Sequence, residues 1–198
     1  KQIYKKNNLF FEKYVALEKS KKKIRFLFKK PKKKLIENIK KFKLIDNKNV
    51  IEYPTVAINY LNVISKKINK HSGALLAFDY GYTKKKNYST LQSVKNHKYI
   101  DIFDQPGNSD ITHHIDYKLF KIILKKNNLE VQKIITQSEF LQKLGIIERA
   151  KMISKKKNFK EKADMFYRLK RLLHYKEMGD LFKVLLAEKK GTKFSLGF

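Results

Sequence analysis

The sequence predicts an α/β fold, in which helices pack on the strands of a sheet. The first indication is the continuous apolar run 73–78, which is typical of a parallel strand buried on both faces and places Asp79 at its C-terminal end. The second is a helix opened by Pro54, because proline at the first helical position gives up no hydrogen bond. The third is the order helix, strand, loop, helix, strand, helices, strand along residues 54–188.

The first fifty residues predict an insertion that is mostly β-structure. Residues 1–4 predict part of a strand. The segments 9–17 and 23–28 predict a β-hairpin, because they are rich in β-forming residues. Residues 32–42 predict a basic, weakly amphipathic helix, and residues 50–53 predict a short strand.

The middle of the chain predicts one helix face and one long loop. The expected apolar face of the helix after Pro54 consists of Val56, Ala57, Tyr60, Leu61, Ile64 and Ile68. Residues 83–115 are expected to be rich in loops, since Pro106 and Gly107 mark turns there.

The C-terminal third predicts further helices and strands. Asp116 is placed to cap a helix that runs through Asn127, and residues 129–135 predict a strand. A last strand is expected over residues 181–187, followed by a tail over 189–198.

Two capping boxes mark helix starts in the same third. Thr136 with Glu139, and Asn158 with Glu161, have the spacing at which each side chain bonds the other residue's backbone N–H. Gly145 is expected to end the first of these helices.

The net charge of +29 raises the possibility of a nucleic-acid-binding protein, but two features argue against it. The 47 basic residues include only four arginines, whereas phosphate recognition favours the planar fork of arginine. Residues 71–116 carry five basic and five acidic residues and four of the five histidines. We therefore interpret the lysine runs as solvated surface and expect the functional site in the neutral window.

Composition also excludes several site classes. The chain contains no cysteine, so disulfides and thiolate metal sites are excluded. No apolar run approaches the roughly 20 residues that a membrane-spanning helix needs.

Five motifs between residues 73 and 187 resemble the MidA-like S-adenosylmethionine-dependent methyltransferases. In chain order they are Gly73-Ala74-Leu75-Leu76-Ala77-Phe78-Asp79-Tyr80-Gly81-Tyr82; Thr90-Leu91-Gln92-Ser93 with Asn96-His97; Pro106-Gly107 with Asp110-Ile111-Thr112-His113-His114-Ile115-Asp116-Tyr117; Thr136-Gln137 with Phe140-Leu141 and Leu144-Gly145-Ile146; and Met178-Gly179-Asp180-Leu181-Phe182-Lys183-Val184. Five motifs in order are far more specific than one. Residues 1–70 resemble the family only loosely.

The resemblance implies the C-terminal part of a Rossmann-like class I methyltransferase sheet. It implies one domain over residues 1–198, with a hairpin and helix inserted in 1–50, the sheet and helices in 54–188, and a tail. The family's glycine-rich cofactor loop has no counterpart here, so the cofactor-binding half is expected upstream and this piece alone is expected to be inactive.

The resemblance also implies an activity, a partner and a location. The implied cofactor is S-adenosyl-L-methionine, and the implied activity is arginine methylation of a protein subunit of respiratory complex I, in the course of complex I assembly. The implied location is the bacterial cytoplasm or the mitochondrial matrix.

Arginine methylation defines what the site has to contain. The guanidinium stays charged and must approach a cationic sulfonium, so carboxylates are needed to neutralise and orient it. We expect Asp79, with Asp110 or Asp116, to hold the guanidinium, and His97 or His114 to accept its proton. The expected substrate-binding residues are Tyr80, Gly81, Gln92, Thr112, Asp116 and Gln137.

Each of these residues has a structural alternative. Asp79 can equally cap a turn, and Asp116 fits a helix cap better than a ligand. Asp110, His113, His114 and Asp116 match the spacing of no standard metal site, so no metal is expected.

Three other functions stay open at this point. A member of the same family could methylate another acceptor, since fold does not fix the substrate. The chain could belong to a non-catalytic complex I assembly factor of the same fold, or to a basic nucleic-acid-binding protein whose binding depends steeply on salt.

Overall fold

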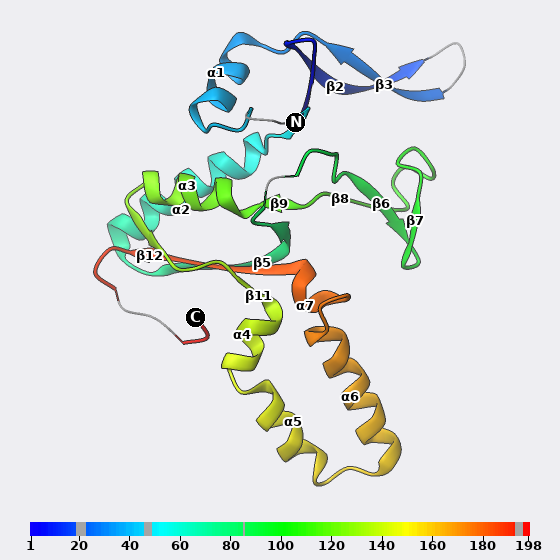
Figure 1. Ribbon diagram of the computed structural model, residues 1–198, viewed down its shortest axis with the longest axis vertical. Helices are drawn as coiled ribbons and strands as arrows, with labels where there is room; N and C mark the ends of the chain where they lie inside the picture. Colours follow the sequence, from blue (N-terminus) through cyan, green and yellow to red (C-terminus); the bar gives the residue numbers. More distant parts are fainter. Residues whose placement is uncertain (19–22, 46–48, 85, 193–195) are drawn as a thin grey trace. The chain divides into compact units, whose positions relative to one another are not determined.

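The computed structural model describes residues 1–18, 23–45, 49–84, 86–192 and 196–198. They form two compact units, which are described one at a time: Lys1–Asn59 with Lys84–His114, and Tyr60–Thr83 with Ile115–Phe198. Figure 1 shows the elements of both. Among the residues described, no helix is long and apolar enough to cross a membrane.

The first unit contains a four-stranded antiparallel sheet. Its strands, in the order β3-β2-β1-β4, are β1 (Gln2–Lys6), β2 (Leu9–Glu18), β3 (Lys23–Lys29) and β4 (Val50–Glu52). The predicted first strand, hairpin and short fourth strand are therefore confirmed. Helix α1 (Lys33–Lys41) is also confirmed, and it buries Leu35 and Ile39.

A second, three-stranded sheet lies in the same unit. It has the order β7-β6-β8, with β6 (Gln92–Lys95), β7 (Lys98–Ile100) and β8 (Asp110–Thr112). The prediction that residues 83–115 are rich in loops is confirmed for most of the described residues of this segment, but these three strands were not predicted. They are three or four residues long and largely polar, so they give almost no hydrophobic alternation to detect.

The second unit contains a mixed sheet with strand order β10-β12-β5-β9, and β11 also pairs with β12. The strands are β5 (Ala74–Tyr82), β9 (Ile115–Asp116), β10 (Leu129–Val131), β11 (Ile135–Thr136) and β12 (Phe182–Lys189). β12 runs antiparallel to both β5 and β10, so β5 and β10 are parallel to each other. The strand predicted over 129–135 is two short strands instead of one.

The prediction that β5 is a parallel strand buried on both faces is wrong. Its long pairing is antiparallel to β12, and its parallel pairing to β9 involves only Gly81 and Tyr82. Leu76 and Phe78 on β5 are 47% and 40% exposed. The strand fully enclosed in this unit is β12, where five consecutive residues are buried.

Helix α2 (Thr55–His71) starts as predicted but turns a different face inward. The buried residues are Ile58, Leu61, Ser65 and Ile68, whereas Val56 and Tyr60 are 67% and 65% exposed. The predicted face is therefore wrong at Val56 and Tyr60. Ser65 is tolerated inside because its hydroxyl donates to the carbonyl of Leu61 at 2.7 Å.

Helix α3 (Tyr117–Lys126) covers one face of the mixed sheet and packs on β10, β12 and β5. The predicted cap is confirmed, since Asp116 Oδ1 accepts the backbone N–H of Leu119 at 3.1 Å. Asn127 joins this helix to α2 by accepting from Asn69 through its carbonyl and donating to Asn62.

Four further helices follow: α4 (Gln137–Lys143), α5 (Ile146–Ser154), α6 (Phe159–Leu173) and α7 (Met178–Leu181). Both predicted capping boxes are confirmed. Gly145, with φ of +77°, separates α4 from α5. Helix α5 was not predicted, because only one turn of apolar residues marks it in the sequence. Near the C-terminus, the Phe198 ring lies 5.4 Å from that of Phe140 on α4 and packs against the apolar cluster of Ile135, Phe140 and Val184.

Candidate functional site

Asp79 lies exposed on β5, three residues before the strand ends. Its Oδ1 accepts the backbone N–H of Tyr80 at 2.7 Å, and its Oδ2 has no hydrogen bond to any residue the structure describes. Successive side chains on a strand point to opposite faces, so Asp79 and Tyr80 do not face the same space. Tyr80 instead packs its ring on that of Phe182, at 4.2 Å between centroids. Asp79 is thus the accessible carboxylate of this strand.

Tyr117, which was not among the predicted site residues, holds the backbone of Asp79 in place. Its side chain is fully buried, and its hydroxyl donates to the carbonyls of Asp79 at 3.3 Å and Lys183 at 3.0 Å. Burial raises the pKa of this hydroxyl well above its usual range, and the charge of Asp79 raises it further. Tyr117 therefore stays a neutral donor that fixes β5 against β12. The sequence feature that could have pointed to Tyr117 is its position directly after the predicted helix cap Asp116.

Gly81 is explained by the same tyrosine. A Cβ on Gly81 would lie 2.4 Å from a ring carbon of Tyr117 and 2.7 Å from the carbonyl oxygen of Ile115. The glycine is buried, and the space beside its Cα is filled by protein. This position is required for packing, and it offers no open backbone to a ligand.

Two other predicted substrate residues of this unit also make structural hydrogen bonds. Asp116 caps α3 as described, and Gln137 is buried with its Nε2 donating to the carbonyl of Leu172 at 3.0 Å. The Gln137 contact fastens α4 to α6. Their roles in substrate binding stay predictions.

In the first unit, the structure brings together predicted residues that are twenty positions apart. Gln92 and Thr112 are register partners on β6 and β8, and Gln92 Nε2 donates to Thr112 Oγ1 at 3.1 Å. Asp110 pairs with Val94 in the same ladder and is exposed. Because every second residue faces the same side, Asp110, Thr112 and Gln92 share one face of this sheet.

A network centred on Glu52 was not predicted. Glu52 Oε1 accepts from Gln2 Nε2 at 2.8 Å and from the Thr90 backbone N–H at 2.9 Å, and its Oε2 accepts from the Thr90 hydroxyl. Thr90 Oγ1 in turn accepts the backbone N–H of His114 at 2.9 Å. Glu52 thus positions His114 through Thr90. Glu52 lies outside the neutral window, so no pattern considered in the sequence pointed to it.

The two candidate histidines differ in how they are held. His114 is partly buried, and its Nδ1 lies 3.2 Å from the Lys86 ammonium, which donates to it. His97 is exposed, and with Asn96 it forms the turn between β6 and β7 at positive φ. Only His114 is fixed by a polar network.

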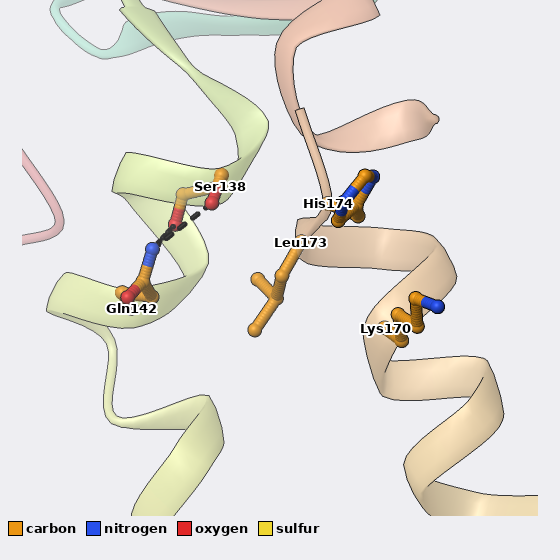
Figure 2. A pocket seen from close by; sticks show the side chains of 5 residues that line it. All are labelled: Ser138, Gln142, Lys170, Leu173 and His174. Atoms are coloured by element: carbon orange, nitrogen blue, oxygen red, sulfur yellow. Dashed lines mark hydrogen bonds between the residues drawn. The ribbon is translucent and has the colours of Figure 1, made fainter. Parts of the chain in front are cut away.

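A solvent-open groove in the second unit is lined by Ser138, Gln142, Lys170, Leu173 and His174. Figure 2 shows that Gln142 bonds Ser138 across one wall, while Leu173 points from α6 toward α4. Among the residues that the structure describes, no three histidine or acidic side chains gather closely enough to hold a metal ion.

Residues 1–135 match a protein family described as "Putative S-adenosyl-L-methionine-dependent methyltransferase". The chain belongs to this methyltransferase family. The motif resemblance is therefore confirmed. The matched segment includes residues 1–70, where the motifs gave only a loose resemblance, and ends before the last two motifs.

Curated relatives of the methyltransferase chain include two mitochondrial proteins. "Protein arginine methyltransferase NDUFAF7, mitochondrial" of Xenopus tropicalis is 27% identical over 131 residues, which are 66% of this chain and 30% of that protein. Its homolog in Caenorhabditis elegans is 30% identical over 93 residues, which are 47% of this chain and 22% of that protein. The matches thus span less than a third of either relative.

Two solved structures from Burkholderia thailandensis establish the fold. One covers all of this methyltransferase chain with a TM-score of 0.82 at 20% identity, and the match is 53% of that chain. The other, solved with S-adenosyl-homocysteine bound, covers 99% with a TM-score of 0.79 at 21% identity, over 51% of that chain. The fold is a mixed α/β fold that corresponds to about half of those structures.

Proposed function

We propose that the protein containing this chain is an S-adenosylmethionine-dependent protein arginine methyltransferase, and that this chain supplies groups for the methyl acceptor. The match of residues 1–135 to the methyltransferase family carries the proposal. Arginine as the acceptor is supported by the names of the Xenopus and Caenorhabditis relatives. A subunit of respiratory complex I, in its assembly, is the protein substrate that the family resemblance implies.

The cofactor's cradle is not built from this chain. Its seven glycines are all at least six residues apart, so the chain contains no glycine-rich loop. The one glycine on a sheet strand, Gly81, is covered by Tyr117. We therefore place the Rossmann-like cofactor half upstream and expect this chain alone to be inactive.

Asp79 is the proposed partner of the guanidinium in the second unit. It is exposed, its Oδ2 has no partner among the residues described, and its backbone is fixed by Tyr117. A guanidinium near a sulfonium at about 4 Å is repelled by about 4 kcal/mol at intermediate dielectric, so a carboxylate is the group this chemistry needs.

Asp110 and His114 are the proposed functional groups of the first unit. Asp110 is an exposed carboxylate on the face that also carries Gln92 and Thr112. His114 is held through Thr90 and Glu52, and histidine is the side chain best suited to accept a proton near neutral pH. Tyr80 and His97 keep their predicted roles only as proposals.

The test is product analysis with the full-length protein. Purified protein, labelled S-adenosylmethionine and a complex I subunit preparation are incubated, and methylated residues are mapped by mass spectrometry. The proposal predicts methylarginine with the full-length protein and none with residues 1–198 alone. Label on another residue type would refute the arginine assignment, and no transfer from an intact, cofactor-bound protein would favour a non-catalytic factor of the same fold.

A further inference from the structure

The turn between α5 and α6 carries three exposed apolar side chains that lie close together in the sequence. Met152 is 70% exposed, Ile153 is 43% exposed and Phe159 is 87% exposed. These three lie within eight residues of sequence, around the turn that joins the two helices. We call this group the apolar tip. Figure 1 shows α5 and α6 side by side, with this turn at the end of the pair away from β12.

The apolar tip is surrounded by positive charge. Lys151, Lys155, Lys156, Lys157, Lys160 and Lys162 all lie within three residues of one of its members. Lys157 pairs with Glu161 at 3.3 Å. Glu161 is the only acidic residue between positions 151 and 162. Lys155, Lys156 and Lys160 have no carboxylate partner among the residues that the structure describes. The tip therefore combines apolar side chains with unneutralised lysines.

The apolar character continues along α6. This helix has no fully buried residue, and Phe166, seven positions after Phe159, lies on the same face and is 43% exposed. Residues 146–173 contain ten basic and three acidic residues, and three of the chain's four arginines. A basic helix with an exposed aromatic stripe is typical of a segment that lies in a membrane interface.

We propose that the apolar tip binds the surface of a bilayer containing anionic phospholipids. Met152, Ile153 and Phe159 enter the boundary between headgroups and acyl chains, and the surrounding lysines contact the anionic headgroups. The arm 146–173 has an excess of seven positive charges, which opposes contact with a second copy of the same arm. The side chains of Met152 and Ile153 neither bind phosphate nor provide an aromatic ring on which a base could stack. A bilayer therefore explains the tip better than a nucleic acid does.

The experiment is vesicle co-flotation of the full-length protein. Vesicles of phosphatidylcholine mixed with phosphatidylglycerol are compared with vesicles of phosphatidylcholine alone. We expect binding to the mixed vesicles only, and weaker binding as salt is raised. Phe159→Ser should lower the partition coefficient about tenfold, because a large apolar side chain no longer leaves water. Lys155→Glu with Lys156→Glu should lower it by at least about tenfold, because attraction becomes repulsion.

Matched variants elsewhere in the chain distinguish binding by the apolar tip from nonspecific binding through net charge or through any exposed aromatic side chain. Tyr99→Ser removes an aromatic side chain that is 77% exposed on β7, and Lys33→Glu with Lys34→Glu reverses two exposed lysines on α1. Both should bind mixed vesicles nearly as well as the parent. Equal loss in the control variants, binding that survives the tip variants, or no flotation with any vesicle would each overturn the proposal. So would tip variants that change only self-association or nucleic-acid retention.

Discussion

The residues predicted for the site have different structural roles in the two units. In the unit of the mixed sheet, Asp116 caps a helix, Gln137 joins two helices, and Gly81 accommodates a tyrosine ring. In the other unit, Gln92 bonds Thr112, and Glu52 reaches His114 through Thr90. Polar side chains next to a large apolar core are used to satisfy its backbone, because an unpaired buried group is costly. Asp79 also accepts a backbone N–H, that of Tyr80, but it is exposed and its Oδ2 has no hydrogen bond to any residue the structure describes.

The comparison predicts that Tyr117 dominates the stability of the mixed-sheet unit. Tyr117→Ala should cost about 3–5 kcal/mol, because it empties a fully buried site and removes the hydroxyl that donates to the carbonyl of Lys183. Urea unfolding of the full-length protein measures this loss. Tyr117→Phe keeps the ring and should cost only about 1 kcal/mol. Similar, small losses in both variants would show that the ring is not the anchor of β5.

Glu52 should matter less to stability and more to function. Glu52→Gln should cost about 1–3 kcal/mol, because one oxygen that accepts the Thr90 hydroxyl becomes a donor. Methyl transfer should also fall, since the backbone at His114 is no longer held. Glu37 is an exposed glutamate on α1, and Glu37→Gln provides the control. Full activity in Glu52→Gln would contradict a positioning role for this network.

The capping box at α4 should contribute about 1 kcal/mol. Thr136→Ala removes the oxygen that accepts the Glu139 backbone N–H at 3.0 Å, so the helix start is left unsatisfied. Thermal unfolding compares it with Thr136→Ser, which keeps a hydroxyl and should stay close to the parent. An unchanged unfolding temperature for Thr136→Ala would mean that α4 is held by packing alone.

The smallest expected effect is a pH dependence at the same cap. The Thr136 backbone N–H lowers the pKa of Glu139 in the folded protein. A carboxyl whose folded pKa is lowered stabilises the fold above its unfolded pKa of about 4.3, and that stabilisation is lost as pH falls through the folded value. The parent should therefore lose slightly more stability than Glu139→Gln on acidification below that range. Parallel pH profiles of unfolding would contradict the assignment.

The sequence predicted the parts of the fold that local chemistry dictates. Asp116, Thr136 and Asn158 mark helix starts through side-chain hydrogen bonds to nearby backbone, and all three caps are present. The hairpin 9–29 was predictable because two β-rich segments flank a short connection.

Long-range pairing was not predictable from the sequence. The apolar run 73–78 fits a strand with a parallel or an antiparallel partner, so its antiparallel pairing with β12 could not be predicted from the run itself. The face of α2 was misassigned because buried Ser65 satisfies itself by bonding Leu61. The Glu52 network joins residues 38 positions apart, and no local pattern encodes such a contact.

The proposed contact between the Asp79 carboxylate and a cationic methyl acceptor can be tested by measuring methyl transfer with Asp79 variants of the full-length protein. Asp79→Ala should abolish transfer, and Asp79→Asn, which keeps size but removes charge, should lower the rate at least about a hundredfold. Asp104→Ala, in an exposed loop, is the control and should keep the parental rate. Parental turnover in a folded, cofactor-binding Asp79→Asn protein would show that the Asp79 carboxylate does not hold the methyl acceptor.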